Sequence, residues 1–123
     1  MNRQAWTAII KQACEQAGTY REFFDPVIDT LAGILEKRDD AEKQLEDEGR
    51  VLVVEHTNKG GSTNLEQSPI VRLINDLNRD ALQYWRDLGL TPAGLKKIND
   101  GMAAKNEMKK SALEEALLSL GGA

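Results

Sequence analysis

The chain has 123 residues and a formal net charge of −4, with 41% apolar and 29% charged side chains. This length suits one domain with a modest core, and aliphatic side chains must fill most of it because aromatic residues make up only 5%. The composition excludes a membrane helix, which needs roughly 20 apolar residues in a row, and an internal disulfide, because Cys14 is the only cysteine.

The numbers of cysteine and histidine residues indicate the cellular compartment and the capacity to bind metals. A single cysteine fits a reducing cytoplasm, and the first residues lead into an amphipathic stretch rather than the apolar block of a secretory signal. One cysteine and one histidine also exclude the usual zinc cages. The sequence therefore predicts no metal and no cofactor.

Charge is unevenly distributed along the chain. Residues 1–50 carry 7 basic and 11 acidic side chains, whereas residues 69–110 carry 8 basic and 5 acidic ones. This asymmetry indicates either a polarised surface or a basic patch that oligomerisation would pool. Ordinary variation in a charged helical protein is the alternative interpretation.

Two helices are predicted in the first half. The first spans about Arg3 to Ala17, with apolar residues at three- and four-residue spacing. The second is long, from about Tyr20 to Glu48, and Thr19 with Glu22 forms a capping-box signature before it. Its apolar seam is continuous to Leu35 and then thins, so its distal part should face solvent or a polar neighbour.

A short β arm is predicted at about residues 51–66. Val51 to Val54 is the only β-like stretch, and Asn58 to Asn64 is a turn by composition. Two strands alone are only marginally stable, so this arm should lean on the helices or pair with another subunit.

Serine and threonine caps followed by proline predict two further helices. Ser68 precedes a third helix over Pro69 to Leu88, with an unbroken apolar seam. Thr91-Pro92 starts a short fourth helix to about Ile98, and Asn99 to Gly101 should break the chain there.

The remaining residues, 99–123, are predicted as a basic and partly mobile tail. Ser111 and Glu114 form a capping box for a short amphipathic helix, which Gly121-Gly122 should stop. A leucine face on so short a helix is rarely stable without a partner. The candidate partner-binding residues are Leu113, Leu117 and Leu120.

The fold class predicted from these elements is mainly α. The seams of the second and third helices are complementary and similar in length, so these helices should form a long antiparallel hairpin. Residues 1–98 would then be a single helical domain made of this hairpin, the N-terminal helix and the β arm.

Catalytic chemistry is poorly supported. The only histidine, His56, lies in the β-like stretch, where a half-exposed structural role competes with that of a base. Cys14 lies on an apolar helix face, as either a buried inert thiol or a reactive one. Lys59 to Thr63 lacks the order of a Walker loop, so a glycine turn is the better interpretation, although Lys59 is placed to touch a phosphate. No enzyme activity is predicted.

Basic residues in the second half are candidates for sequence-independent DNA contact, because binding to the DNA backbone requires Lys or Arg against phosphates. Three arginines repeat every seven residues, and nearby aspartates leave a purely structural salt-bridge ladder as the alternative. A helix-turn-helix over residues 3–35 is disfavoured because its second helix opens with acidic residues. The candidate DNA-binding residues are Lys59, Arg72, Arg79, Arg86, Lys96, Lys97, Lys105, Lys109 and Lys110.

A string of motifs over about residues 5–98 carries a resemblance to a known family. A glutamate-rich helix end at Glu46 to Gly49 is followed by the valine-rich strand, the glycine turn and Ser68-Pro69, and then by Leu-Gly-Leu-Thr-Pro at Leu88 to Pro92. In this order the chain resembles the small terminase subunit of tailed bacteriophages, of the cohesive-end-type branch.

The resemblance implies a non-enzymatic DNA-packaging component. Such subunits assemble into ring-shaped homo-oligomers, bind double-stranded viral DNA near the packaging start, and regulate the large terminase subunit, which holds the ATPase and nuclease. It implies the cytoplasm of the infected bacterial host as the location, no membrane, and docking of the C-terminal segment on the large subunit. A helical protein–protein interaction module without DNA binding is the alternative.

Overall fold

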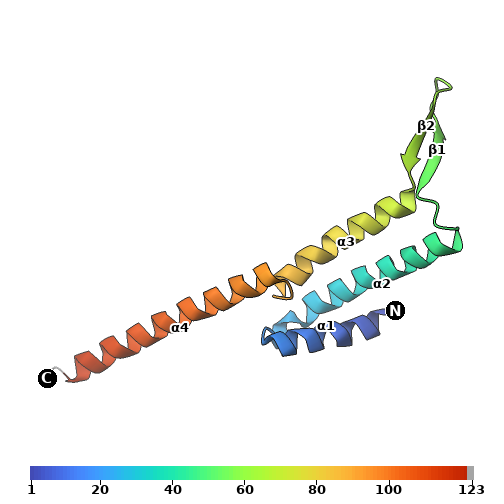
Figure 1. Cartoon of the computed structure of the whole chain (residues 1–123). Helices are drawn as coiled ribbons and strands as arrows, with labels where there is room; N and C mark the ends of the chain where they lie inside the picture. The colour runs from blue at the N-terminus through green and yellow to red at the C-terminus, as the bar shows by residue number, and fades with distance from the viewer. Residues whose placement is uncertain (122–123) are drawn as a thin grey trace.

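The computed structural model describes residues 1–121 of the chain. Three helices lie side by side, a β arm projects from one end of them, and a long helix extends from the other end (Figure 1). The elements in chain order are α1 (Arg3–Ala17), a 3-10 turn η1 (Glu22–Phe24), α2 (Asp25–Asp47), β1 (Val53–Thr57), β2 (Thr63–Gln67), α3 (Pro69–Asp87) and α4 (Pro92–Gly121).

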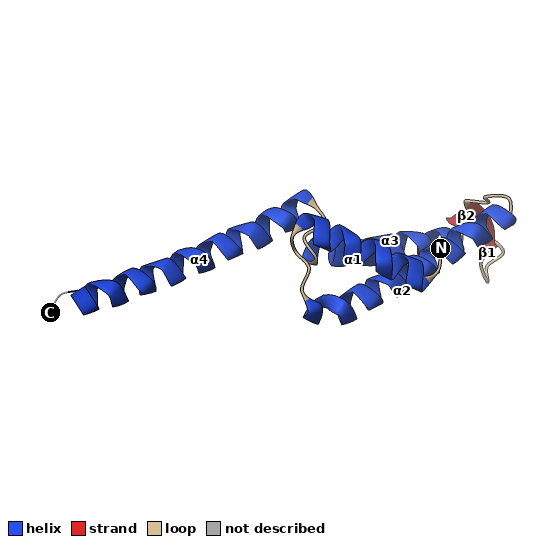
Figure 2. Ribbon diagram, turned by 90° about the horizontal axis from the view of Figure 1, so that it is seen from below, coloured by secondary structure: helices blue, strands red, loops and turns tan. Residues whose placement is uncertain are grey.

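The predicted antiparallel hairpin is formed by α2 and α3, and α1 packs against it (Figures 1 and 2). Their shared apolar faces build the main core, in which Leu31 and Leu35 of α2 are fully buried. The other members of this core are Ile10, Cys14, Ile28, Ala32, Ala81 and Leu88. A second, smaller core holds the distal half of the hairpin together through Ala41, Leu45 and Ile74.

Polar contacts fix α1 on α2 at positions from Asp29 to Asp39. The Arg3 guanidinium donates to both carboxylate oxygens of Asp29, at 2.9 and 2.8 Å. The Trp6 indole N–H donates to Asp39 Oδ2 at 2.7 Å, and the Arg38 guanidinium lies 5.5 Å from the Trp6 ring centroid. The polar neighbour of α2 at Asp39 is therefore α1, whereas Ala41 and Leu45 further along are buried against α3.

Asp39 makes this junction sensitive to pH. Burial would raise the pKa of Asp39, but hydrogen bonds from Trp6 and Arg38 outweigh burial and hold it below its ordinary value. A carboxylate whose folded-state pKa is depressed contributes stability above its unfolded pKa of about 3.9, and that contribution is lost as the pH falls through the folded pKa.

We expect Asp39→Asn to lower the free energy of unfolding by roughly 1–2 kcal/mol at pH 7, because the bonds to charged Arg38 are weakened. The difference from the wild type should shrink as the pH is lowered from 7 through the depressed pKa of folded Asp39. Urea unfolding over a series of pH values, followed by far-UV circular dichroism, measures it. Asp40→Asn, an exposed neighbour, is the matched control, and an equal loss in both variants would contradict the role of Asp39.

The start of α2 differs from the prediction. The helix begins at Asp25 rather than near Tyr20, after the single 3-10 turn. The capping box is also wrong, because the Thr19 hydroxyl donates to the Leu88 carbonyl at 2.8 Å. A long-range contact that buries Thr19 to 3% exposure has replaced the local cap.

The β arm is confirmed as a two-stranded antiparallel hairpin, with Val53 opposite Gln67 and Thr57 opposite Thr63. Its first strand starts two residues later than the valine-rich stretch. The Asn58 side-chain oxygen closes the turn by accepting from the backbone N–H groups of Gly60 and Ser62, each at 3.0 Å.

The third helix has almost the predicted bounds, but the predicted cap is wrong because the Ser68 side chain makes no capping hydrogen bond. Pro69 occupies its first turn, and its last carbonyls are closed by the backbone N–H groups of Leu88 and Gly89. Gly89 has φ +74°, in the left-handed region that favours glycine. The Thr91 hydroxyl then accepts from the Gly94 N–H at 3.1 Å and caps the next helix as expected.

The fourth helix was predicted wrongly. It does not end at Ile98 but continues through Asn99 to Gly101 and onward to Gly121 as one helix of 30 residues. One internal glycine costs a helix only about 1 kcal/mol relative to alanine, and the residues after Gly101 are mostly strong helix formers. The separate short tail helix is therefore the end of α4. The stop expected at Gly121-Gly122 lies partly outside the described residues.

Candidate functional site

The three arginines repeated every seven residues lie on the outer face of α3. Arg72, Arg79 and Arg86 are all exposed, whereas Ile74 and Ala81 on the opposite face are buried in the hairpin. Helical geometry places the three guanidinium groups on a single line along the helix. This face is therefore open to a partner.

The salt-bridge ladder that competes with this interpretation is mostly absent. Among residues 1–121, only Arg79 of the three arginines has an ion pair, with Asp76 three residues earlier at 3.5 Å. Both side chains are more than half exposed, and exposed pairs of this kind contribute little to stability. Structural pairing therefore does not account for Arg72 and Arg86.

The α3–α4 junction brings two predicted residues together. Arg86 at the end of α3 and Lys97 in the first turns of α4 line the same pocket, together with Asp87, Ala93, Gly94 and Ile98. Helix α4 approaches so closely here that a Cβ atom on Gly94 would lie 2.1 Å from the Arg86 carbonyl oxygen. The position of Lys97 relative to Arg86 is consequently fixed by backbone packing.

The remaining lysines divide between the two ends of the molecule. Lys96 lies beside Lys97, and Lys105, Lys109 and Lys110 follow along exposed α4. Lys59 lies in the turn between β1 and β2, at the tip of the arm and far from α4 (Figure 1). The structure therefore brings Arg86 and Lys97 together, spreads the other candidates along α3 and α4, and separates Lys59 from α4.

The three candidate partner-binding leucines are exposed near the end of α4. Leu113, Leu117 and Leu120 have 62%, 59% and 79% of their surface accessible. Every residue from 99 to 120 is exposed, and both views show this part of α4 extending away from the three packed helices (Figures 1 and 2).

A groove that the sequence did not indicate lies between the α1–α2 corner and α4. Phe23 is 73% exposed there, and Phe24 lies against it with ring centroids 4.6 Å apart. The remaining lining residues are Thr19, Arg21, Asp87, Ile98, Met102, Lys105, Asn106 and Lys109. We call this the Phe23 groove. No local pattern in the sequence places Phe23 on the surface.

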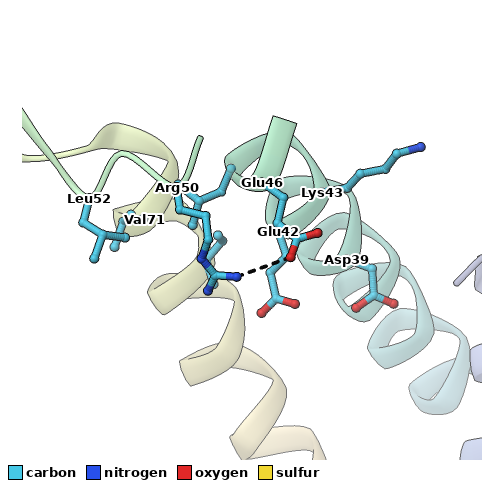
Figure 3. A pocket seen from close by; sticks show the side chains of 9 residues that line it. Asp39, Glu42, Lys43, Glu46, Arg50, Leu52 and Val71 are labelled. Carbon is cyan, nitrogen blue, oxygen red and sulfur yellow. Dashed lines mark hydrogen bonds and ion pairs between the residues drawn. The ribbon is translucent and has the colours of Figure 1, made fainter. Parts of the chain in front are cut away.

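A second pocket lies between distal α2 and the start of α3 (Figure 3). Its floor is apolar, with Leu45, Val71 and Ile74, and its rim carries Arg50 paired with Glu46 at 3.3 Å. The pair is exposed and its geometry is that of ordinary helix-end stabilisation. The pocket holds no arrangement of base and nucleophile.

The potentially reactive residues are not assembled into a centre. Cys14 is fully buried, and burial raises the pKa of its thiol, which makes it a poor nucleophile. Within residues 1–121 no group of three or more His, Cys, Asp or Glu side chains is placed to hold a metal ion. None of the helices in that range has the length and apolar content needed to cross a bilayer.

Comparison with known proteins gives one match. The family model described as "Phage terminase, small subunit" matches residues 3–107, which include all three packed helices, the arm and the first half of α4. No curated protein and no solved structure matches the chain. Because the family model covers most of its length, the chain belongs to the phage terminase small-subunit family.

Proposed function

We propose that this chain is a non-enzymatic DNA-binding subunit that acts when phage DNA packaging begins. In this proposal it forms a ring-shaped homo-oligomer, binds double-stranded viral DNA, and regulates the ATPase and nuclease of the large terminase subunit in the host cytoplasm. Membership of the small-subunit family over residues 3–107 is the observation that carries the proposal.

The exposed basic face of α3 and the start of α4 supports DNA contact there. Arg72, Arg79 and Arg86 point away from the core, and Lys97 lies beside Arg86 at the junction. Exposed guanidinium and ammonium groups suit the phosphate backbone, which requires charge and spacing rather than base-specific geometry. Asp76, Asp80 and Asp87 of α3 are exposed as well, so the positive charge of this region comes from the lysines of α4. The acidic half of α2 would face away from the DNA or towards a neighbouring copy.

The exposed leucines of α4 support a contact with the large subunit. A helix end with three accessible leucines is poorly stable alone and gains stability when its apolar face is covered. The end of α4 also lies well away from the arm and the hairpin, so that contact leaves the rest of the subunit free (Figure 1).

We expect the double variant Arg86→Gln/Lys97→Gln to bind duplex DNA more weakly than the wild type and with a shallower salt dependence. Each lost phosphate contact should reduce the slope of log K against log[salt] by about 0.9, so the pair should reduce it by about 1.8. Fluorescence anisotropy with a labelled duplex, over a series of salt concentrations, measures both quantities.

The matched control is Lys37→Gln/Lys43→Gln, which removes the same charge from exposed positions on α2. Its salt slope should equal that of the wild type. A wild-type chain that shows no salt-dependent binding to duplex DNA would instead support a protein-only interaction module. Equal slopes for both double variants would move the DNA contact away from the α3–α4 junction.

A further inference from the structure

Residues 102–120 of α4 carry a continuous stripe whose far end is left uncovered by the rest of residues 1–121. At 100° per residue, Met102, Lys109, Leu113 and Leu120 fall within a sector of about 40°, with Asn106 and Leu117 beside it. The N-terminal part of this stripe forms one wall of the Phe23 groove, because Met102, Asn106 and Lys109 line that groove. Its far end carries only exposed leucines.

The groove and the far end of the stripe are complementary in chemistry. The Phe23 groove has an apolar floor and carries Arg21, Lys105 and Lys109 against one acid, Asp87. The far end of α4, residues 111–121, has four leucines and two glutamates and no basic residue. An apolar, basic groove and an apolar, acidic helix are matched in both respects.

The far end cannot fill the groove of its own chain. Helix α4 is continuous from Pro92 to Gly121, and Leu113 lies 11 residues beyond Met102, which is about 16 Å along the helix axis. A straight helix does not fold back on itself over that distance. A leucine-rich helix end that fills the groove must therefore come from another molecule.

We propose that two copies of this chain pair through antiparallel α4 helices, each placing its Leu113–Leu120 segment in the Phe23 groove of the other. With a two-fold axis beside Ser111 and Ala112, Leu120 of one copy lies against Met102 of its partner, and Leu117 lies against Asn106. On one flank of the interface, Lys110 of each copy then faces Glu114 of the other, twice by symmetry.

The antiparallel arrangement is the one that brings opposite charges together. A parallel pair would place the two copies of Lys110 on opposite flanks of the interface, so Lys110 and Glu114 of different copies would not meet. It would also stack the leucines of both copies on each other and leave both Phe23 grooves open. The antiparallel pair covers two grooves and two leucine ends at once.

This pairing rests on the self-association that the proposed function includes, and it adds a condition to that function. It covers Leu113, Leu117 and Leu120, the same residues that are assigned to the large subunit. One α4 end therefore serves one partner at a time, and docking on the large subunit requires that the pair separate first.

Disulfide trapping in the full-length chain tests the pairing. Asn106→Cys and Leu117→Cys are made as separate variants, with Cys14 retained because it is fully buried. A mixture of the two should form disulfide-linked dimers under mild oxidation, whereas each variant alone should not, because its two cysteines would lie about 16 Å apart along the axis. Leu118→Cys is the matched control, since Leu118 is more accessible than Leu117, at 75% against 59%, but lies on another face.

Each alternative outcome overturns the pairing. Dimers formed by either variant alone would indicate a parallel arrangement, and equal trapping of Leu118→Cys with Asn106→Cys would indicate random collision. Sedimentation of the wild type separates this proposal from the proposed function. If the wild type is an oligomer but no disulfide-linked dimer forms, only the antiparallel pairing is contradicted. A strict monomer at micromolar concentration would contradict the ring as well.

Discussion

Gly94→Ala is expected to lower the free energy of unfolding by about 3 kcal/mol, a large effect for the addition of one methyl group. The added Cβ atom would lie 2.1 Å from the Arg86 carbonyl oxygen and 2.9 Å from its carbonyl carbon. Both are backbone atoms of α3, so no side chain can rotate to make room. The start of α4 must shift away from α3, and the packing of the junction is lost.

The control for this prediction is Gly101→Ala in the same helix. Nothing lies within 4 Å of a Cβ atom at Gly101, and alanine is the better helix former by about 1 kcal/mol. The two identical substitutions should therefore change stability in opposite directions, as measured by urea unfolding. A destabilising Gly101→Ala would mean that the chain bends or breaks at Asn99 to Gly101.

Leu31→Ala is expected to lower the free energy of unfolding by about 3–4 kcal/mol, from the lost apolar burial and the cavity left behind. Leu31 is completely buried in the first half of α2, in the core shared by α1, α2 and α3. For a domain whose total stability is about 5–15 kcal/mol, this loss is a large fraction. Thermal unfolding should shift downward while the far-UV spectrum at low temperature keeps its helical shape.

Leu73→Ala is the matched control, because the same atoms are removed from a side chain on α3 that is 49% exposed. Its cost should stay below about 1 kcal/mol, since much of that surface already faces water. If Leu31→Ala cost no more than Leu73→Ala, the three helices would not share the core described.

Periodicity in the sequence was sufficient to predict the packed helices and the arm. The spacing of apolar residues predicts α1 and α3 because each helix has one buried face. Their bounds are marked by Gly18, which ends α1, and by Pro69, which starts α3. The hairpin of α2 and α3 followed from seams of matching length. These are local signals, and tertiary contacts reinforced them.

The predictions were wrong where a contact distant in sequence, or the helix propensity of the surrounding residues, determined the local structure. Thr19 reads locally as a helix cap, but its hydroxyl bonds to a carbonyl 69 residues away. Asn99 to Gly101 reads locally as a break, although the surrounding helix formers carry α4 through it. Nothing local indicates that Phe23 lies exposed beside α4, so the groove became visible only in the folded chain.

Short-range backbone contacts at Gly89 and Gly94 have a mechanical consequence. Helix α4 has 30 residues, so its free end lies about 45 Å from this junction. A tilt of only about 10° at the junction would carry the leucine end through about 8 Å, which is nearly the width of a helix. The junction lies beside Arg86 and Lys97. A ligand that tilted α4 slightly at this junction would therefore move its far end over a much larger distance.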